Sequence, residues 1–172
     1  MTPYPVMNLS YPGFHNGVSG ERTDEIELRV LPHLRNYFPS GKAPSGTIML
    51  LHAGTNDMAQ SVVNTTAVGN LNDIINTTVA FDPDIKIFVA QIIPINITAT
   101  DAKINDYNNL VGAMVNTTKL TNSNIYLVDM NGAFKANTNW QADYFPSTNT
   151  HPNDAGYDVM GAAWANAINA SN

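Results

Sequence analysis

The chain has 172 residues, which is the size of one globular domain that can bury a core unaided. Hydrophobic residues make up 44%, but no apolar run approaches the roughly 18 to 20 residues of a bilayer span, so we expect no integral membrane protein. A net charge of −6 without a Lys/Arg cluster makes nucleic acid an unfavourable partner. The absence of cysteine excludes a disulfide scaffold, a thiolate zinc site and a cysteine nucleophile.

Short apolar runs alternate with longer amphipathic stretches along the chain, which predicts an α/β domain with a mostly parallel sheet. Three runs are apolar enough to be strands covered on both faces. A weaker candidate strand precedes them at residues 5–10. The three stronger runs are residues 47–53, 85–93 and 124–130.

Four amphipathic stretches predict helices. Thr23 is a candidate cap for the first, and Pro32 should kink or shorten it. The second is expected over residues 58–79. The side chains expected to face inward are Ile26, Val30 and Leu34 in the first helix, Val63, Ala67, Leu71 and Ile74 in the second, Ile104, Tyr107, Val111 and Met114 in the third, and Met160, Ala163, Trp164 and Ala167 in the last.

The loops that follow the strands are where chemistry is expected, because open parallel sheets bind ligands beyond the carboxyl ends of their strands. In the loop Gly54-Thr55-Asn56-Asp57, the amide of Asn56 could donate to an oxyanion, an interaction worth roughly 3 to 4 kcal/mol in a transition state. The alternative is a strand-to-helix turn in which Gly54 relieves strain and Asn56 or Asp57 caps the next helix.

Two further positions have the right chemistry. His151 opens the segment His-Pro-Asn-Asp-Ala-Gly-Tyr before the last helix, and Pro152 holds it extended, as an accessible general base requires. Gly20 directly precedes the first helix, where its backbone N–H could be a second oxyanion donor. Taken singly, each also fits an ordinary role, a histidine on a loop and a glycine in a turn.

In this order, Gly20, the GTND of residues 54–57 and the HPN of residues 151–153 resemble three of the four signature blocks of the SGNH (GDSL-like) hydrolase superfamily. The segments IFVAQIIP (87–94), LVDM (127–130) and HPNDAGY (151–157) are most similar to carbohydrate esterase family 3, the acetylxylan esterases. The similarity runs from about residue 17 to the end of the chain.

The resemblance implies a flavodoxin-like three-layer α/β/α sandwich and metal-independent ester hydrolysis without a cofactor. A serine attacks the acyl carbon, a histidine serves as base and acid, and a serine N–H, a glycine N–H and an asparagine amide hold the oxyanion. Matched residue by residue, Gly20, Asn56 and His151 take the glycine, asparagine and histidine roles. The implied substrate is an acetylated polysaccharide or a small acetyl ester.

The family's first block, Gly-Asp-Ser-Leu, is absent from the sequence. It should end the first strand some tens of residues before the glycine block, and only 19 residues precede Gly20. Either the block is lost and residues 5–9 form the second strand, or a helix and an edge strand are lost and residues 5–9 form the first strand. In the second case Ser10 stands where the nucleophile belongs; otherwise it is a hydroxyl in a strand-end turn. Thr148 occupies the position of the family's acid, so a backbone carbonyl, Asp143 or Asp154 would have to orient His151.

The sequence therefore predicts an acetylxylan esterase-like domain with weak or no activity, because losing a triad member costs about 10⁴-fold. The alternatives are a catalytically dead carbohydrate-binding relative and a truncated fragment of such an esterase. Trp140 and Tyr144 could stack on sugar rings or anchor their loop. Six N-x-S/T sequons favour a secreted glycoprotein, although several would arise by chance in so Asn- and Thr-rich a chain: Asn8, Asn64, Asn76, Asn96, Asn116 and Asn169.

Overall fold

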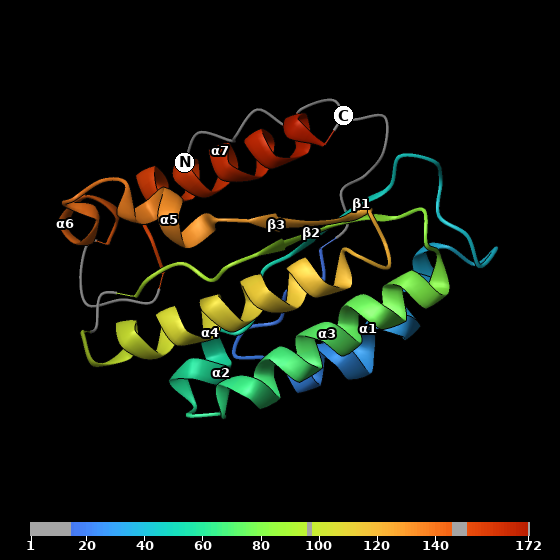
Figure 1. Cartoon of the computed structure of the whole chain (residues 1–172), viewed down its shortest axis with the longest axis horizontal. Helices are drawn as coiled ribbons and strands as arrows, with labels where there is room; N and C mark the ends of the chain where they lie inside the picture. The colour runs from blue at the N-terminus through green and yellow to red at the C-terminus, as the bar shows by residue number, and fades with distance from the viewer. Residues whose placement is uncertain (1–14, 96–97, 146–150, 172) are drawn as a thin grey trace.

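The computed structural model describes residues 15–95, 98–145 and 151–171, and the side chains of residues 98–101 are outside that description. Within these ranges helices alternate with strands (Figure 1). The elements are α1 (Thr23–Tyr37), β1 (Ile48–Leu51), α2 (Thr55–Ala59), α3 (Asn64–Phe81), β2 (Lys86–Ala90), α4 (Thr98–Thr118), β3 (Ile125–Val128), α5 (Met130–Lys135), α6 (Trp140–Tyr144) and α7 (Asp154–Ala170).

The described strands form one parallel sheet in the order β1-β2-β3. Met49 pairs with Ile87, and Ile87 pairs with Ile125. Each of the three stronger predicted strands is therefore present, and the predicted α/β class is confirmed. The weaker strand predicted at residues 5–10 lies outside the described residues.

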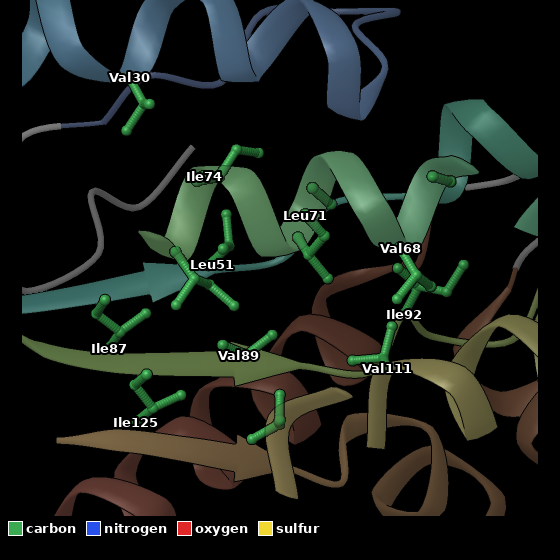
Figure 2. Packing of buried hydrophobic residues seen from close by; sticks show 14 of the residues in the cluster. Val30, Leu51, Val68, Leu71, Ile74, Ile87, Val89, Ile92, Val111 and Ile125 are labelled. Carbon is green, nitrogen blue, oxygen red and sulfur yellow. The ribbon is translucent and has the colours of Figure 1, made fainter. Parts of the chain in front are cut away.

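Helices cover both faces of the sheet in three layers: α7 lies on one face, and α1, α3 and α4 lie on the other (Figure 1). In the larger core, Leu51 and Val89 point from their strands toward Leu71 and Ile74 on α3 (Figure 2). The smaller core, under α7, contains Phe88 with partly buried side chains of that helix. The inward stripes predicted for α4 and α7 are confirmed, since their members belong to these two cores.

Three details differ from the sequence prediction. Pro32 lies inside α1 without ending it, so the helix runs for 15 residues. The predicted helix over residues 58–79 is divided into α2 and α3, with Ser61 between them at a φ of 62°. Val63 then precedes α3 and is 65% exposed, instead of facing inward.

The strands also differ in how completely they are covered. The side chains of Ile87, Phe88 and Val89 in β2 are fully buried, as predicted for a strand covered on both faces. In β1, Met49 and Leu51 pack in the larger core, but Ile48 is 40% and Leu50 is 48% exposed. The prediction of two covered faces is therefore wrong for β1, because an apolar run looks the same whether one face or both are buried.

Candidate active site

The carboxyl ends of the three strands meet at one edge of the sheet. The short helix α2 follows β1, residues 91–95 follow β2, and α5 follows β3; α7 also begins at this end (Figure 1). The segments that the sequence singled out for chemistry are therefore gathered at a single edge.

The turn after β1 requires glycine. Gly54 has a φ of +121°, and a Cβ there would lie 2.5 Å from the ring of Tyr107. That ring is fully buried, and its hydroxyl donates to the Ala53 carbonyl at 3.0 Å. The chain thus turns against an immovable side chain and begins α2 at Thr55.

Asp57 fastens this turn to the start of α1. Its carboxylate is fully buried and accepts from the Thr23 backbone N–H at 3.0 Å and from the Thr23 hydroxyl at 2.7 Å. A carboxylate is favoured at a helix N-terminus, where unpaired N–H groups and the helix dipole meet it. Thr23 is therefore not the cap that the sequence predicted: Arg22 occupies that position and donates its N–H to Glu25 at 2.9 Å.

Asn56 and Gly20, the two predicted oxyanion donors, are brought together. The Asn56 Nδ2 donates to the Glu21 carbonyl at 2.8 Å, one residue beyond Gly20, and Gln60 donates to the Gly20 carbonyl at 3.3 Å. Gly20 is exposed and has a φ of +83°, a conformation that favours glycine. An amide nitrogen carries two hydrogens, so the Glu21 bond fixes the Asn56 side chain and leaves a second N–H for an oxyanion.

A polar network that the sequence analysis missed holds the loop after β2. Ile92 donates its N–H to Asn108 at 2.8 Å, and the Ile92 carbonyl accepts from Asn108 at 2.9 Å and from Asn131 at 3.0 Å. Both asparagines are buried. A buried amide on the apolar stripe of α4, next to Tyr107, is the signal that could have revealed Asn108.

The segment that carries His151 is fixed by its neighbours. Asn153 caps α7 by accepting from the Gly156 N–H at 3.0 Å, and its Nδ2 donates to the Asp143 carbonyl at 2.8 Å. A Cβ on Gly156 would lie 2.5 Å from Pro152, so glycine lets that proline pack on the first turn of α7. His151 itself is exposed, and its imidazole makes no hydrogen bond to a described residue.

The residues proposed to orient His151 are placed as follows. The Asp143 carboxylate accepts from the Asn137 side chain at 2.7 Å, and Asp154 is exposed in the first turn of α7. Thr148 and Ser10 lie outside the described residues. The structure thus brings Gly20 and Asn56 into one cluster and sets His151 at the start of α7, on the same sheet edge.

Trp140 and Tyr144 belong to an aromatic cluster beneath α7. Trp140 lies edge-on to Phe145 at 5.8 Å between ring centroids, and Tyr144 lies edge-on to Phe134 at 5.3 Å. Both are half-buried. They therefore anchor α6 to the core, which is one of the two roles that the sequence allowed; the other was stacking on sugar rings. Part of each residue remains accessible.

The described residues hold neither a metal-binding cluster nor a helix that could cross a bilayer. No three His, Cys, Asp or Glu side chains among them gather closely enough to hold a metal ion. None of the described helices combines the length and apolar character of a bilayer crossing.

Comparison with known proteins identifies the class. The sequence profile of the GDSL-like lipase/acylhydrolase family matches residues 4–159, so the chain belongs to that family, as its motifs predicted. Comparison with curated protein sequences gives no match.

Solved structures show the same fold. A GDSL-like lipase from Bacteroides thetaiotaomicron is 22% identical, with 91% of this chain and 75% of that one covered and a TM-score of 0.70. A carbohydrate esterase family 3 structure from Talaromyces cellulolyticus is 22% identical, with 91% and 72% covered and a TM-score of 0.71. The family 3 carbohydrate esterase of Clostridium thermocellum is 19% identical, with 91% of this chain and 70% of that one covered and a TM-score of 0.72. These likenesses confirm the predicted SGNH hydrolase fold.

Proposed function

We propose that this chain is a slow acetyl esterase that removes O-acetyl groups from plant polysaccharide at the carboxyl edge of its sheet. The observation that carries the proposal is the 2.8 Å hydrogen bond from Asn56 to the Glu21 carbonyl. It places one candidate oxyanion donor, the Asn56 amide, against the residue that follows Gly20, whose N–H is the other candidate donor. The fold and the family agree with this chemistry.

In the proposed reaction the Ser10 hydroxyl attacks the acetyl carbon while His151 takes its proton. Gly20 and Asn56 donate to the oxygen that becomes negative, and each such donor is worth roughly 3 to 4 kcal/mol to the transition state. The tetrahedral intermediate then expels the sugar alkoxide, which receives the proton from His151. Water, activated by the same imidazole, releases acetate and restores the Ser10 hydroxyl.

Turnover should be slow, because no carboxylate among the described residues contacts His151 as the family's acid would. Thr148 stands at the acid position, and the carboxylate of Asp143 is engaged by Asn137. An imidazole without its acid partner loses about 10⁴-fold in rate. The same observation favours a second candidate function, a carbohydrate-binding relative that keeps the fold and has lost hydrolysis.

The proposed substrate class is supported by two of the structural neighbours and by two aromatic rings. Two of the solved structures are family 3 carbohydrate esterases. The accessible parts of Trp140 and Tyr144, which are half-buried next to the His151 segment, are proposed to contact sugar rings.

We further propose that the protein acts outside the cell as a glycoprotein. Of its sequon asparagines, Asn76, Asn116 and Asn169 are exposed on helices, whereas Asn64 is half-buried and donates to the Lys103 carbonyl. Expression through a eukaryotic secretory route, followed by enzymatic removal of N-glycans, should therefore lower the mass of the wild type. An unchanged mass would refute glycosylation.

The function is tested by hydrolysis of p-nitrophenyl acetate and by fluorophosphonate labelling with intact-mass detection. Replacing Ser10 or His151 by Ala should reduce the rate to background, and Asn56→Ala should lower kcat about 10² to 10³-fold. The matched control is Asn166→Ala, since this side chain is exposed on α7 and distant in sequence from the site residues.

The two candidate functions give different results. An adduct on Ser10 with wild-type hydrolysis supports the esterase. Binding of xylo-oligosaccharide without hydrolysis or adduct supports the carbohydrate-binding relative, and a rate that none of the substitutions alters removes the esterase proposal for this chain.

A further inference from the structure

Packing does not hold Gly20 in place. The residue is exposed, with a φ of +83°, and a Cβ built on it would meet nothing within 4 Å. Glycine has more conformational freedom than any other residue, so such a turn is mobile unless neighbouring groups restrict it. An oxyanion donor, in contrast, is effective because it has its final orientation before the reaction begins. If the Gly20 N–H is such a donor, other groups have to fix its peptide.

Two amides from one short segment bind this turn. Asn56, on α2, donates to the Glu21 carbonyl at 2.8 Å, and Gln60, which directly follows α2, donates to the Gly20 carbonyl at 3.3 Å. The Gln60 N–H donates to the Asn56 carbonyl at 2.9 Å, so the helical turn continues to Gln60. Residues four apart in a helix share a face, and the two amides therefore reach consecutive carbonyls from the same side.

The two ends of the Gly20 residue differ in how they are used. Its carbonyl is bound by Gln60, whereas its N–H has no acceptor among the described residues. A bound carbonyl restricts the rotation of the turn, and the unpaired N–H remains available to a ligand. This is the arrangement that a preorganised donor requires.

The Gln60 amide is itself oriented by Arg22. The Nη1 of Arg22 donates to the Gln60 Oε1 at 3.1 Å, so the amide oxygen faces the guanidinium and the amide nitrogen faces the Gly20 carbonyl. A guanidinium carries donors only, so it disfavours the flipped amide. Asp24 in turn holds the guanidinium, accepting from Nε at 3.0 Å and from Nη2 at 2.8 Å. A continuous set of contacts thus runs from Asp24 to Gly20.

We propose that Gln60 is a positioning residue of the candidate oxyanion site: it fixes the Gly20 peptide so that its N–H and the Asn56 amide donate to the same substrate oxygen. Gln60 acts through the glycine and not on the substrate, because its nitrogen is directed at the Gly20 carbonyl and its oxygen at Arg22. The inference deepens the proposed function, on which its meaning for catalysis rests. The fixing of Gly20 is a property of the folded chain and can be measured without hydrolysis.

The first test is Gln60→Met in the full chain, which keeps the length of the side chain and adds no charge but removes both hydrogen bonds. In ¹⁵N relaxation measurements, the order parameter of the Gly20 N–H should be about 0.85 in the wild type and below about 0.6 in the variant. Gly46 is the internal control, since it is also exposed, has a φ of +82° and has no Cβ contact. Its order parameter should be the same in both proteins.

The second test is the hydrolysis of p-nitrophenyl acetate. Gln60→Met should lower kcat about tenfold and change KM less than about twofold, because a loosened donor stabilises the transition state less and does not contact the bound ester. Gln60→Glu keeps the acceptor for Arg22 and loses the donor to Gly20, so it should lower both kcat and the order parameter of Gly20. Asn166→Met, on the exposed side of α7, is the matched control and should change neither.

Two results would overturn the proposal. One is an order parameter of Gly20 that neither Gln60 variant lowers, which would show that Gln60 does not fix the peptide. The other is a lowered order parameter with an unchanged kcat, which would show that a fixed Gly20 is not needed in the reaction. If Gln60→Met fails to fold, Gln60→Glu decides by the same two measurements.

The failures of the two proposals are distinguishable. If the wild type hydrolyses no ester, the esterase proposal fails, and the order parameter of Gly20 still decides whether Gln60 fixes this peptide. If hydrolysis depends on Ser10 and His151 but Gln60→Met changes neither kcat nor Gly20, the esterase proposal stands and the positioning role of Gln60 is rejected.

Discussion

The two segments that carry the candidate site, residues 52–57 and 151–157, are built in opposite ways. In the first, the groups that shape the site are also structural: Gly54 turns against Tyr107, and the buried Asp57 holds the start of α1. In the second, support and chemistry are divided, because Asn153 and Gly156 fix the segment while His151 is exposed. Substitutions in the first segment should therefore cost stability, and His151 should be replaceable without loss of fold.

The largest effect is expected from Gly54→Ala. The new Cβ would meet the Tyr107 ring at 2.5 Å, and the φ of +121° is unfavourable for alanine. Because the ring is buried and cannot move aside, we expect a loss of about 3 kcal/mol or more in the free energy of unfolding. Urea unfolding followed by circular dichroism measures it.

Gly69→Ala provides the control for that prediction. Gly69 lies on α3 with nothing within 4 Å of its added Cβ, so alanine should stabilise the helix by roughly 0.5 to 1 kcal/mol. If Gly54→Ala and Gly69→Ala had the same free energy of unfolding, the turn after β1 would not require glycine.

The next effect is a pH dependence that belongs to the first segment. Burial lowers the pKa of His52 from 6.5 to about 4. Between these values the unfolded chain binds a proton that the folded chain does not, so the free energy of unfolding falls as the pH is lowered, by up to about 3 kcal/mol. Unfolding curves from pH 7 to pH 4 should show this fall, and His52→Leu should have a flatter profile. Identical profiles would mean that His52 is solvated when folded.

A smaller loss is expected from Asp57→Asn. The amide keeps one acceptor oxygen but loses the charge, and either the Thr23 N–H or the Thr23 hydroxyl is left without its carboxylate oxygen. We expect a loss of about 2 kcal/mol in the free energy of unfolding. Asp73→Asn, on the exposed side of α3, is the matched control and should change it by less than about 0.5 kcal/mol. Equal losses in the free energy of unfolding for Asp57→Asn and Asp73→Asn would show that the Asp57 carboxylate does not hold the start of α1.

Much of the fold could be predicted, because the spacing of hydrophobic residues along the chain indicates which side chains are buried. The stripe of Ile104, Tyr107 and Val111 predicted α4, and the apolar runs predicted three strands. The division between α2 and α3 could not be predicted, since it depends on the left-handed Ser61, a residue type common inside helices and loops alike. The exposure of Ile48 and Leu50 in β1 could not be predicted either, because the apolar run does not show which elements pack on each face of the strand.

For the candidate site, local motifs located the segments but not the contacts between them. Gly20 and Asn56 were predicted to meet, and the structure has Asn56 hydrogen-bonded to the carbonyl of Glu21, the residue after Gly20. The contact between Asp57 and Thr23 joins residues 34 positions apart and appears in the sequence only as two ordinary capping residues. Spacing along the chain carries no information on such pairs, so they had to come from the structure.

The smallest expected effect separates support from chemistry in the second segment. Asn153→Ala removes both the cap on the Gly156 N–H and the bond to the Asp143 carbonyl, so it should cost about 1 to 2 kcal/mol in the free energy of unfolding. Asn153→Asp keeps the capping oxygen and loses only the Nδ2 donor, and it should cost about half as much. His151→Ala, in contrast, should leave the unfolding curve unchanged within about 0.5 kcal/mol, because the imidazole is exposed. If His151→Ala proved as destabilising as Asn153→Ala, the histidine would be part of the support, and the division between the two segments would have to be abandoned.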